Sequence, residues 1–372
     1  MLKRTTALSN EFKFAKLFKV QNIINALITP AELKQDFPLS KEINDFVKQS
    51  QQDIISIIQG LDDRLLVIVG PCSIHDPVAA LDYAKQLQQL QLKFQQELFI
   101  VMRVFIEKPR TTVGWKGLVN DPWLNQTYDV NHGLKISRKL LIDINQLGLP
   151  VATEFLSNML PAYTQDLISW AAIGARTTES QIHREFASSM NFAVGFKNNT
   201  DGNIQMAIDA ITSARNSHVF FTTDQNGKLA TCQSAGNPNS HLVLRGGNEP
   251  NYNKTDIKQS IKKLKAAKAH SKLMVDCSHN NSQKDHLKQS SVANYLAQLI
   301  AKGSGDILGV MLESFLVEGR QSLQDIKHLT YGQSTTDACI NLEQSQSIFS
   351  ELANAVMQRR SLNESELAIN TG

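Results

Sequence analysis

The chain has 372 residues, a length that suits one large domain or two ordinary ones. Its 38 Lys and Arg and 35 Asp and Glu leave a net charge of only +3, so we expect neither nucleic acid nor a membrane among its partners. Early charges and the lack of a long apolar run near the N-terminus predict no secretory signal and no membrane span. The four cysteines form no C-x-x-C pair, which argues against a zinc ribbon or a disulfide framework and favours a cytoplasmic location.

Residues 1–60 are expected to form an N-terminal extension with a regulatory or oligomerisation role, because they are polar and mostly helical in composition. Thr29 stands directly before Pro30, a pair that predicts the start of a helix with Thr29 as its N-cap. The extension carries no catalytic constellation. At the other end, residues 361–372 are expected to be a flexible tail.

From Leu65 to Gln324 the sequence alternates between strand and helix patterns. About eight strands are expected, at 65–70, from 98 onward, and at 150–155, 171–176, 193–197, 242–245, 273–277 and 307–313. Eight β/α units with a right-handed crossover at each step predict a closed (β/α)8 TIM barrel over residues 61–360. A doubly wound open sheet is the structural alternative.

Helix starts and one insertion can be placed within this alternation. Asp76 before Pro77 predicts the N-cap of the first crossover helix, and Asp201 is expected to cap a later one. A further helix is expected near 163–170. Residues 218–233 contain two strand patterns around an Asn-Gly turn, so they predict an inserted β-hairpin.

The stretch from 98 to 117 combines a buried strand with a cationic loop. Arg103 lies near the end of the strand, and the loop adds Lys108, Arg110 and Lys116 with Glu107 as the one nearby carboxylate. Four cations in so short a segment suggest an anion site, although a solvated basic loop is the simpler interpretation.

In a barrel the chemistry lies at the C-terminal ends of the strands, where the βα loops converge. Charged side chains stand at these ends in nearly every predicted strand, namely Arg103 with Lys108, Glu154, Arg176, Lys197, Arg245 and Asp276 with His279. Lys and Arg are rarely buried unless they are paired, so each could be a structural ion pair. Together, five cations suggest a ligand with more than one anionic group, such as a phosphate and a carboxylate.

A second set of strand-end residues is of metal type: Cys72, His279, Glu313 and Asp337. One thiolate, one imidazole and two carboxylates suit Mn, Fe, Co or Zn, and differ from both a closed structural zinc site and an oxygen-only magnesium cage. Without the barrel, Cys72 would be a small core residue and His279 a helix-capping or core histidine.

Eight segments of the sequence are similar to segments of one family, the microbial, feedback-regulated class I 3-deoxy-D-arabino-heptulosonate 7-phosphate (DAHP) synthases. The resemblance covers about residues 29–360. The segments are GPCSIHDP at 70–77, MRVFIEKPRTTVGWKGL at 102–118, AIGARTTESQIHRE at 172–185, VGFKNNTDG at 194–202, LRGGNEPNY at 244–252, DCSHNNSQK at 276–284, GVMLESFLVEGRQ at 309–321 and YGQSTTDACI at 331–340.

The resemblance implies a metal-dependent condensation of phosphoenolpyruvate with D-erythrose 4-phosphate and water, the first step of the shikimate pathway, with release of phosphate. By position, phosphoenolpyruvate is expected to bind Arg103, Lys108, Glu154, Ala175, Arg176, Lys197 and Arg245. Erythrose 4-phosphate is expected to bind Lys108, Pro109, Arg110 and Thr111. The divalent metal (Mn, Fe, Co or Zn) is expected to bind Cys72, His279, Glu313 and Asp337, and Lys108, Cys72 and His279 are the expected catalytic residues.

The resemblance also implies an aromatic amino-acid effector, Phe, Tyr or Trp, bound by the N-terminal extension and the segments 156–163 and 188–194. Leu17 and Phe18 stand about where the phenylalanine-regulated type has acidic residues, so the identity of the effector stays open, and insensitivity is one outcome. A homodimer or homotetramer is expected.

Two alternatives remain. The first is 3-deoxy-D-manno-octulosonate 8-phosphate synthase, whose relatives carry an Ala-Asn-Arg-Ser-like run where this chain has Pro109-Arg110-Thr111-Thr112. The second is a non-catalytic barrel kept as an amino-acid sensor. That protein would be expected to have lost a ligand position, and all four are present.

Overall fold

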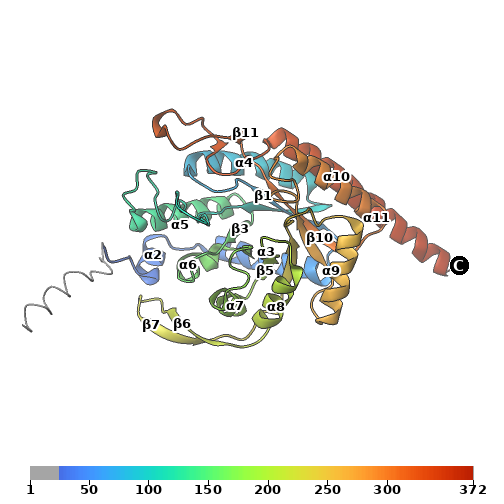
Figure 1. Ribbon diagram of the computed structural model, residues 1–372, viewed down its shortest axis with the longest axis horizontal. Coiled ribbons are helices and arrows are strands. Elements are labelled where there is room, and N and C mark those ends of the chain that lie inside the picture. The colour runs from blue at the N-terminus through green and yellow to red at the C-terminus, as the bar shows by residue number, and fades with distance from the viewer. Residues whose placement is uncertain (1–24, 372) are drawn as a thin grey trace, which may run out of the picture.

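Eight parallel strands close into a barrel in the computed structural model, which describes residues 25–371 and their side chains as far as 365 (Figure 1). The strands follow one another around the barrel in the order β1-β10-β9-β8-β5-β4-β3-β2. Their bounds are β1 Leu65–Gly70, β2 Leu98–Arg103, β3 Val151–Glu154, β4 Trp170–Ile173, β5 Ala193–Lys197, β8 Ser240–Leu244, β9 Leu273–Asp276 and β10 Ile307–Glu313. The predicted (β/α)8 barrel is confirmed. The open-sheet alternative is wrong, because β1 pairs in parallel with both β2 and β10.

Close packing of the strands depends on small residues at two points. A Cβ at Gly309 of β10 would lie 2.2 Å from the carbonyl oxygen of Leu66 on β1. A Cβ at Gly195 of β5 would lie 2.4 Å from the ring of Trp170, which fills the barrel interior at 0% exposure. Larger side chains at these positions would push neighbouring strands apart.

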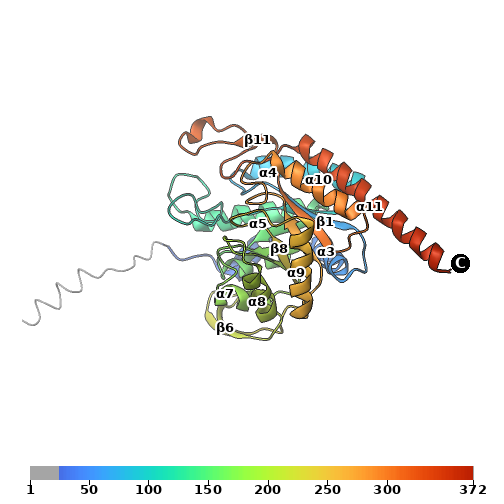
Figure 2. The same cartoon turned by 45° about the vertical axis from the view of Figure 1, so that its right-hand side comes forward.

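Helices surround the barrel, and α10 and α11 run side by side on one flank (Figures 1 and 2). The crossover helices are α4 Pro77–Phe94, α5 Val130–Gln146, α6 Leu160–Thr164, α7 Gln181–Ser188, α8 Ile204–Ala214, α9 Lys254–Ala266, α10 Lys288–Ala301 and α11 Leu342–Thr371. Asp76 caps α4 as predicted. The N-cap of α8 is Asn203 instead of Asp201, whose carboxylate accepts a hydrogen bond from the Asn203 N–H. The helix expected at 163–170 is shorter, since α6 is followed by a 3-10 turn at Gln165–Leu167 and then by β4.

Two helices of the N-terminal extension are described. Thr29 caps α2 Pro30–Asp36 in a reciprocal capping box with Glu32, as the sequence predicts. The longer α3 Lys41–Gln59 places Ile54, Ile57 and Ile58 against the inward-facing residues at the start of the strands. It therefore closes the N-terminal end of the barrel with an apolar plug. Residues 1–24, including Leu17 and Phe18, lie outside the described residues.

Three further segments lie outside the barrel. The predicted hairpin at 218–233 forms as antiparallel β6 Val219–Thr223 and β7 Leu229–Gln233. A small sheet of β11 Val317–Arg320 and β12 Gln333–Ser334 was not predicted. Residues 361–371 continue α11 as a helix where a flexible tail is expected, and their flexibility stays a prediction. Among the helices described, none combines the length and the apolar character needed to cross a membrane.

Candidate active site

A cavity of about 600 Å³ opens at the C-terminal ends of the barrel strands. Every residue that the sequence assigns to metal or substrate lines it: Cys72, Arg103, Lys108, Pro109, Arg110, Thr111, Glu154, Ala175, Arg176, Lys197, Arg245, His279, Glu313 and Asp337. These residues come from all eight barrel strands and the loops that follow them. Barrel closure therefore brings together side chains that are up to 265 positions apart in the sequence.

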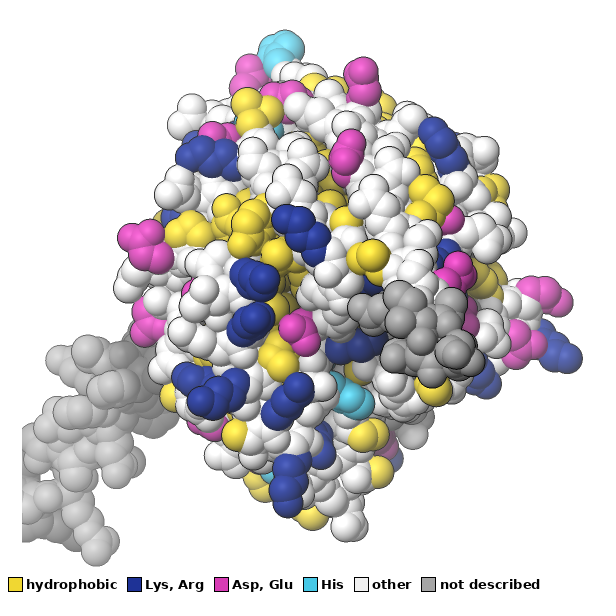
Figure 3. All heavy atoms as spheres, turned by 90° about the vertical axis from the view of Figure 1, so that its right-hand side faces the viewer, with side chains coloured by type: hydrophobic (Ala, Val, Ile, Leu, Met, Phe, Trp, Pro, Cys, Tyr) yellow, Lys and Arg dark blue, Asp and Glu magenta, His cyan; other side chains and the backbone are white. Residues whose placement is uncertain are grey.

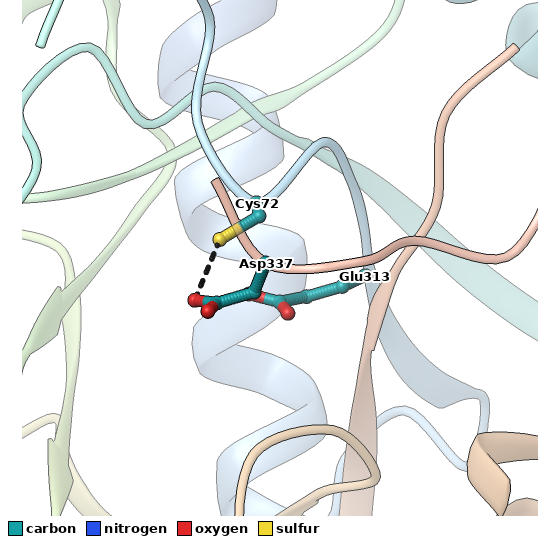
Figure 4. A group of neighbouring side chains, drawn as sticks. All are labelled: Cys72, Glu313 and Asp337. Carbon is teal, nitrogen blue, oxygen red and sulfur yellow. Dashed lines mark hydrogen bonds between the residues drawn. The ribbon is translucent and has the colours of Figure 1, made fainter. Parts of the chain in front are cut away.

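Three of the four predicted metal ligands form a tight group. The donor atoms of Cys72, Glu313 and Asp337 all lie within 4.8 Å of one another, and the Cys72 thiol donates a hydrogen bond of 3.2 Å to Asp337 Oδ2 (Figure 4). His279 lies just beyond this group, with its Nε2 atom 3.7 Å from Glu313 Oε1. A thiol, two carboxylates and an imidazole facing one point fit a divalent first-row transition metal or zinc.

Lys108 lies against the same group. Its Nζ atom is 2.8 Å from Cys72 Sγ and 2.9 Å from Asp337 Oδ2. Burial disfavours the charge of Lys108, but the charges of Asp337 and Glu313 and the hydrogen bond to Cys72 outweigh burial and raise the pKa of the ammonium. Burial opposes the charge of Asp337 as well, yet Lys108 holds the pKa of that carboxyl below its usual range. Both groups are therefore charged at neutral pH.

The surroundings of Cys72 strongly favour the protonated form of its thiol. Burial is the main cause that raises the pKa of the Cys72 thiol to about 12, and the charge of Glu313 adds to it. The protein alone therefore keeps Cys72 as a thiol at neutral pH. A metal ion that binds the sulfur as thiolate must displace this proton.

The buried cations of the cavity are held by ion pairs. Arg103 and Glu313, each with 2% side-chain exposure, are joined at 2.8 Å, and the Arg103 guanidinium lies 3.7 Å from the centre of the Phe105 ring. Lys197 lies 3.1 Å from Asp276. The simpler interpretation of these residues as structural ion pairs thus holds for Arg103 and Lys197, but both also line the cavity.

Glu154 is fitted into the wall by a glycine on the neighbouring strand end. A Cβ at Gly174 would lie 2.0 Å from Glu154 Oε1, so the carboxylate occupies the space that any other side chain would need. Glu154 is 6% exposed and lines the cavity beside Ala175 and Arg176. The absence of a side chain at Gly174 therefore leaves room for the Glu154 carboxylate to face the cavity.

The cationic loop after β2 divides into two parts. Lys108 and Arg110 line the cavity, whereas Lys116 is not among its lining residues. The Lys108 N–H donates to the Lys116 carbonyl and folds the loop back on itself. Arg110 Nε donates to the Trp115 carbonyl across the same turn.

Sequence reasoning missed several cavity residues. Lys284, His286 and Arg320 line the outer part of the cavity, in the segment after β9 and at the end of β11. They lie inside or next to the matching segments but not at the end of a barrel strand, where the sequence predicts the chemistry. Asp276 does stand at a predicted strand end, but the sequence assigns it no role.

Three comparisons with known proteins agree. The family model described as "DAHP synthetase I family" matches residues 36–350. The Trp-sensitive phospho-2-dehydro-3-deoxyheptonate aldolase of Buchnera aphidicola subsp. Schizaphis graminum is 51% identical over 336 residues, which are 90% of this chain and 97% of that one. The enzyme of the same name from Escherichia coli K12 is 50% identical over the same shares. The structure of phospho-2-dehydro-3-deoxyheptonate aldolase from Francisella tularensis SCHU S4 superposes with a TM-score of 0.89 at 49% identity, covering 91% of this chain and 99% of that one.

Proposed function

Since the chain belongs to the DAHP synthetase I family and is a DAHP synthase, we propose that its barrel cavity joins phosphoenolpyruvate to D-erythrose 4-phosphate with the residues described above. One observation carries the proposal: a metal-type donor group and a cradle of cations face each other in a single cavity. A non-catalytic sensor would have no need to keep both.

Phosphoenolpyruvate is assigned to the deeper cations. Arg103, Lys197 and Arg245 are each less than a tenth exposed, so an anion that reaches them leaves water and gains strong charge-assisted hydrogen bonds. Arg176, Lys108 and the backbone at Ala175 complete this subsite at the cavity wall. Glu154 would orient the water that adds to the central carbon of phosphoenolpyruvate.

Erythrose 4-phosphate is assigned to the loop from Lys108 to Thr111, which lies at the mouth of the cavity. Arg110 and Thr111 are exposed, so they can receive a phosphate that arrives from solvent. Lys108 is shared by both subsites, and its ammonium is charged in the apo site. It can therefore hold two small anions close together that would otherwise repel each other.

Cys72, His279, Glu313 and Asp337 would hold a divalent metal, with Mn, Fe, Co and Zn as candidates. When bound, the metal supplies Lewis acidity toward the aldehyde oxygen. Side chains of the protein carry out the other steps of the reaction. Lys108 neutralises developing negative charge, Glu154 orients water, and the cations around the phosphate favour its departure as the carbon–oxygen bond breaks.

The relatives suggest a regulator. The enzymes from Buchnera aphidicola and Escherichia coli are Trp-sensitive by name, so we assign Trp as the effector of this chain, bound near 156–163 and 188–194. The protein is expected to be a cytoplasmic homodimer or homotetramer. The structure shows one point of contact between the extension and the first of these segments, since Tyr163 Oη donates to the Ile28 carbonyl.

One assay tests the proposal: release of phosphate from phosphoenolpyruvate with either erythrose 4-phosphate or arabinose 5-phosphate. We expect activity with erythrose 4-phosphate, loss of activity with a chelator, recovery with added Mn²⁺ or Co²⁺, and inhibition by Trp but not by Phe or Tyr. Activity with arabinose 5-phosphate alone would overturn the substrate, and chelator-resistant activity would overturn the metal. Inhibition by Phe or Tyr only, or by none of the three, would overturn the effector.

A further inference from the structure

Asp276 is a carboxylate at the end of β9 with 0% exposure and no role in the function proposed above. Its Oδ1 atom accepts hydrogen bonds from Ser278, from the N–H at 3.0 Å and from the hydroxyl at 2.6 Å. Its Oδ2 atom lies 2.8 Å from His279 Nδ1 and 3.1 Å from Lys197 Nζ. One carboxylate oxygen thus contacts an imidazole of the metal group and an ammonium of the phosphoenolpyruvate group.

This carboxylate is ionised. Its surroundings are those of an ion, because the Lys197 ammonium faces one oxygen and two donors of Ser278 face the other. A buried ion of this kind is kept only while its partners stay in place. Asp276 is therefore sensitive to any ligand that competes for either partner.

The geometry of His279 depends on the same contact. The residue has a left-handed backbone with φ 54°, a conformation that is uncommon for a non-glycine residue. His279 Nδ1 lies 2.8 Å from Asp276 Oδ2 and 2.7 Å from Ser278 Oγ. Because the Ser278 hydroxyl donates to Asp276, its oxygen accepts from His279, and the proton belongs on Nδ1. Nε2, on the side of Glu313, then keeps its lone pair for a metal.

We propose that Asp276 is a positioning residue that makes the binding of metal and the binding of phosphoenolpyruvate strengthen each other. An anion that binds Lys197 takes up part of the ammonium's charge, so the charge of Asp276 acts more strongly on His279. The imidazole becomes a better donor, and by linkage a bound metal strengthens anion binding by the same factor. The proposal rests on the metal and phosphoenolpyruvate assignments made above.

A second ion pair links the same two groups, but it cannot be separated from the site. Arg103 contacts Glu313 directly at 2.8 Å, and Glu313 is itself an assigned metal ligand. A change there would remove a ligand and not only the link. Asp276 is the part of the connection that can be altered with all four assigned ligands intact.

The test compares the wild type with Asp276→Asn, which keeps the shape and removes the charge. Both are loaded with Co²⁺ and titrated with a competing chelator, with and without phosphoenolpyruvate, while the thiolate-to-cobalt absorption is followed. We expect phosphoenolpyruvate to tighten Co²⁺ binding to the wild type by roughly 5- to 150-fold. In Asp276→Asn we expect Co²⁺ to bind roughly 10- to 100-fold more weakly, with most of the tightening lost.

Two results would overturn the proposal: no tightening in the wild type, or undiminished tightening in Asp276→Asn whatever its Co²⁺ affinity. Asp209→Asn is the matched control, because it makes the same substitution at an exposed position of α8 that does not line the cavity, and it should retain the tightening. Cobalt absorption that survives Cys72→Ala would instead overturn the metal assignment itself. If Asp276→Asn does not fold by circular dichroism, ¹⁵N-histidine-labelled wild type without metal gives a second readout. The His279 ring signals should move on addition of phosphoenolpyruvate, and unmoved signals would overturn the coupling.

Discussion

The two ends of the barrel are built on opposite principles. At the C-terminal end, buried charges are paired across strands, as in Arg103 with Glu313, and the backbone of His279 is left-handed. At the N-terminal end, α3 inserts Ile54, Ile57 and Ile58 among apolar side chains of the barrel interior. The buried charges and the left-handed backbone at the first end reduce the free energy of unfolding but prepare the site for ligands. The apolar burial at the second end offsets this loss of stability.

The outer surface of the N-terminal end of the barrel also differs from the C-terminal end. The end of α11 marks this face, because Arg360 forms an ion pair with Asp63 directly before β1. Figure 3 views the molecule from that side, and Lys and Arg side chains lie there in a loose band beside exposed apolar side chains. Among the described residues, the group with metal-type geometry, Cys72 with the carboxylates of Glu313 and Asp337, lies at the other end. The separation of chemistry from stability can be tested residue by residue.

The largest effect is expected from a loss of metal ligands. Cys72→Ala and His279→Ala should each lower kcat/KM by roughly 10³-fold or more, because the assigned metal contributes several kcal/mol to the reaction. Phosphate release measures the loss, and thermal unfolding should show a midpoint close to that of the wild type. Full activity in either variant would remove that residue from the metal site.

The reverse pattern is expected at the plug. Ile57 is 1% exposed, so Ile57→Ala should lower the free energy of unfolding by about 2 to 5 kcal/mol through lost burial and a residual cavity. Denaturant unfolding measures the change, and kcat/KM at a temperature where the variant is folded should stay within about 2-fold of the wild type. A parallel loss of activity would show that the two ends are not independent. Ile57→Val is the milder control.

A pH effect should distinguish the rim from the plug. Burial, the largest cause, raises the pKa of Glu107 to about 7, against the hydrogen bonds it accepts from the Leu156 and Ser157 N–H groups. A carboxyl with a raised pKa stabilises the fold below its unfolded pKa and loses that contribution as pH rises through 7. Between pH 5.5 and 8 the wild type should therefore lose about 2 kcal/mol relative to Glu107→Gln. Urea unfolding of both proteins at the two pH values checks this, and parallel pH profiles would contradict it.

The smallest effect concerns a structural residue at the rim. Asn253 caps α9 by accepting hydrogen bonds from the N–H groups of Thr255 and Asp256. Asn253→Ala should lower the free energy of unfolding by about 1 kcal/mol and leave kcat/KM unchanged, whereas Asn253→Asp should keep the cap. A change in activity with the Ala variant would extend the functional region beyond the cavity.

Much of this organisation could be predicted from the sequence, because it depends on local patterns. Buried parallel strands are continuous apolar runs, so the sequence predicts their number and where each one ends. Because the cavity of a barrel lies at the C-terminal ends of its strands, the residues at these ends are the predicted cavity residues. What could not be predicted depends on tertiary contacts. The turn that joins Lys108 to Lys116 is made by a backbone hydrogen bond, and no pattern at Asp276 shows that Lys197, from another strand, lies beside its carboxylate.

The closure of the barrel also determines how late in protein synthesis β1 can pair with its last neighbour. β1 pairs on one side with β10, and Asp63 is tied to Arg360, so the first strand cannot be completed until nearly the whole chain has left the ribosome. At about 5 to 20 residues per second, the roughly 240 residues between β1 and β10 take about 12 to 50 s to translate. For that time the hydrogen-bonding edge of β1 has no final partner, and an open apolar edge can pair with another chain. Translation is therefore the period in which the protein most needs protection from aggregation.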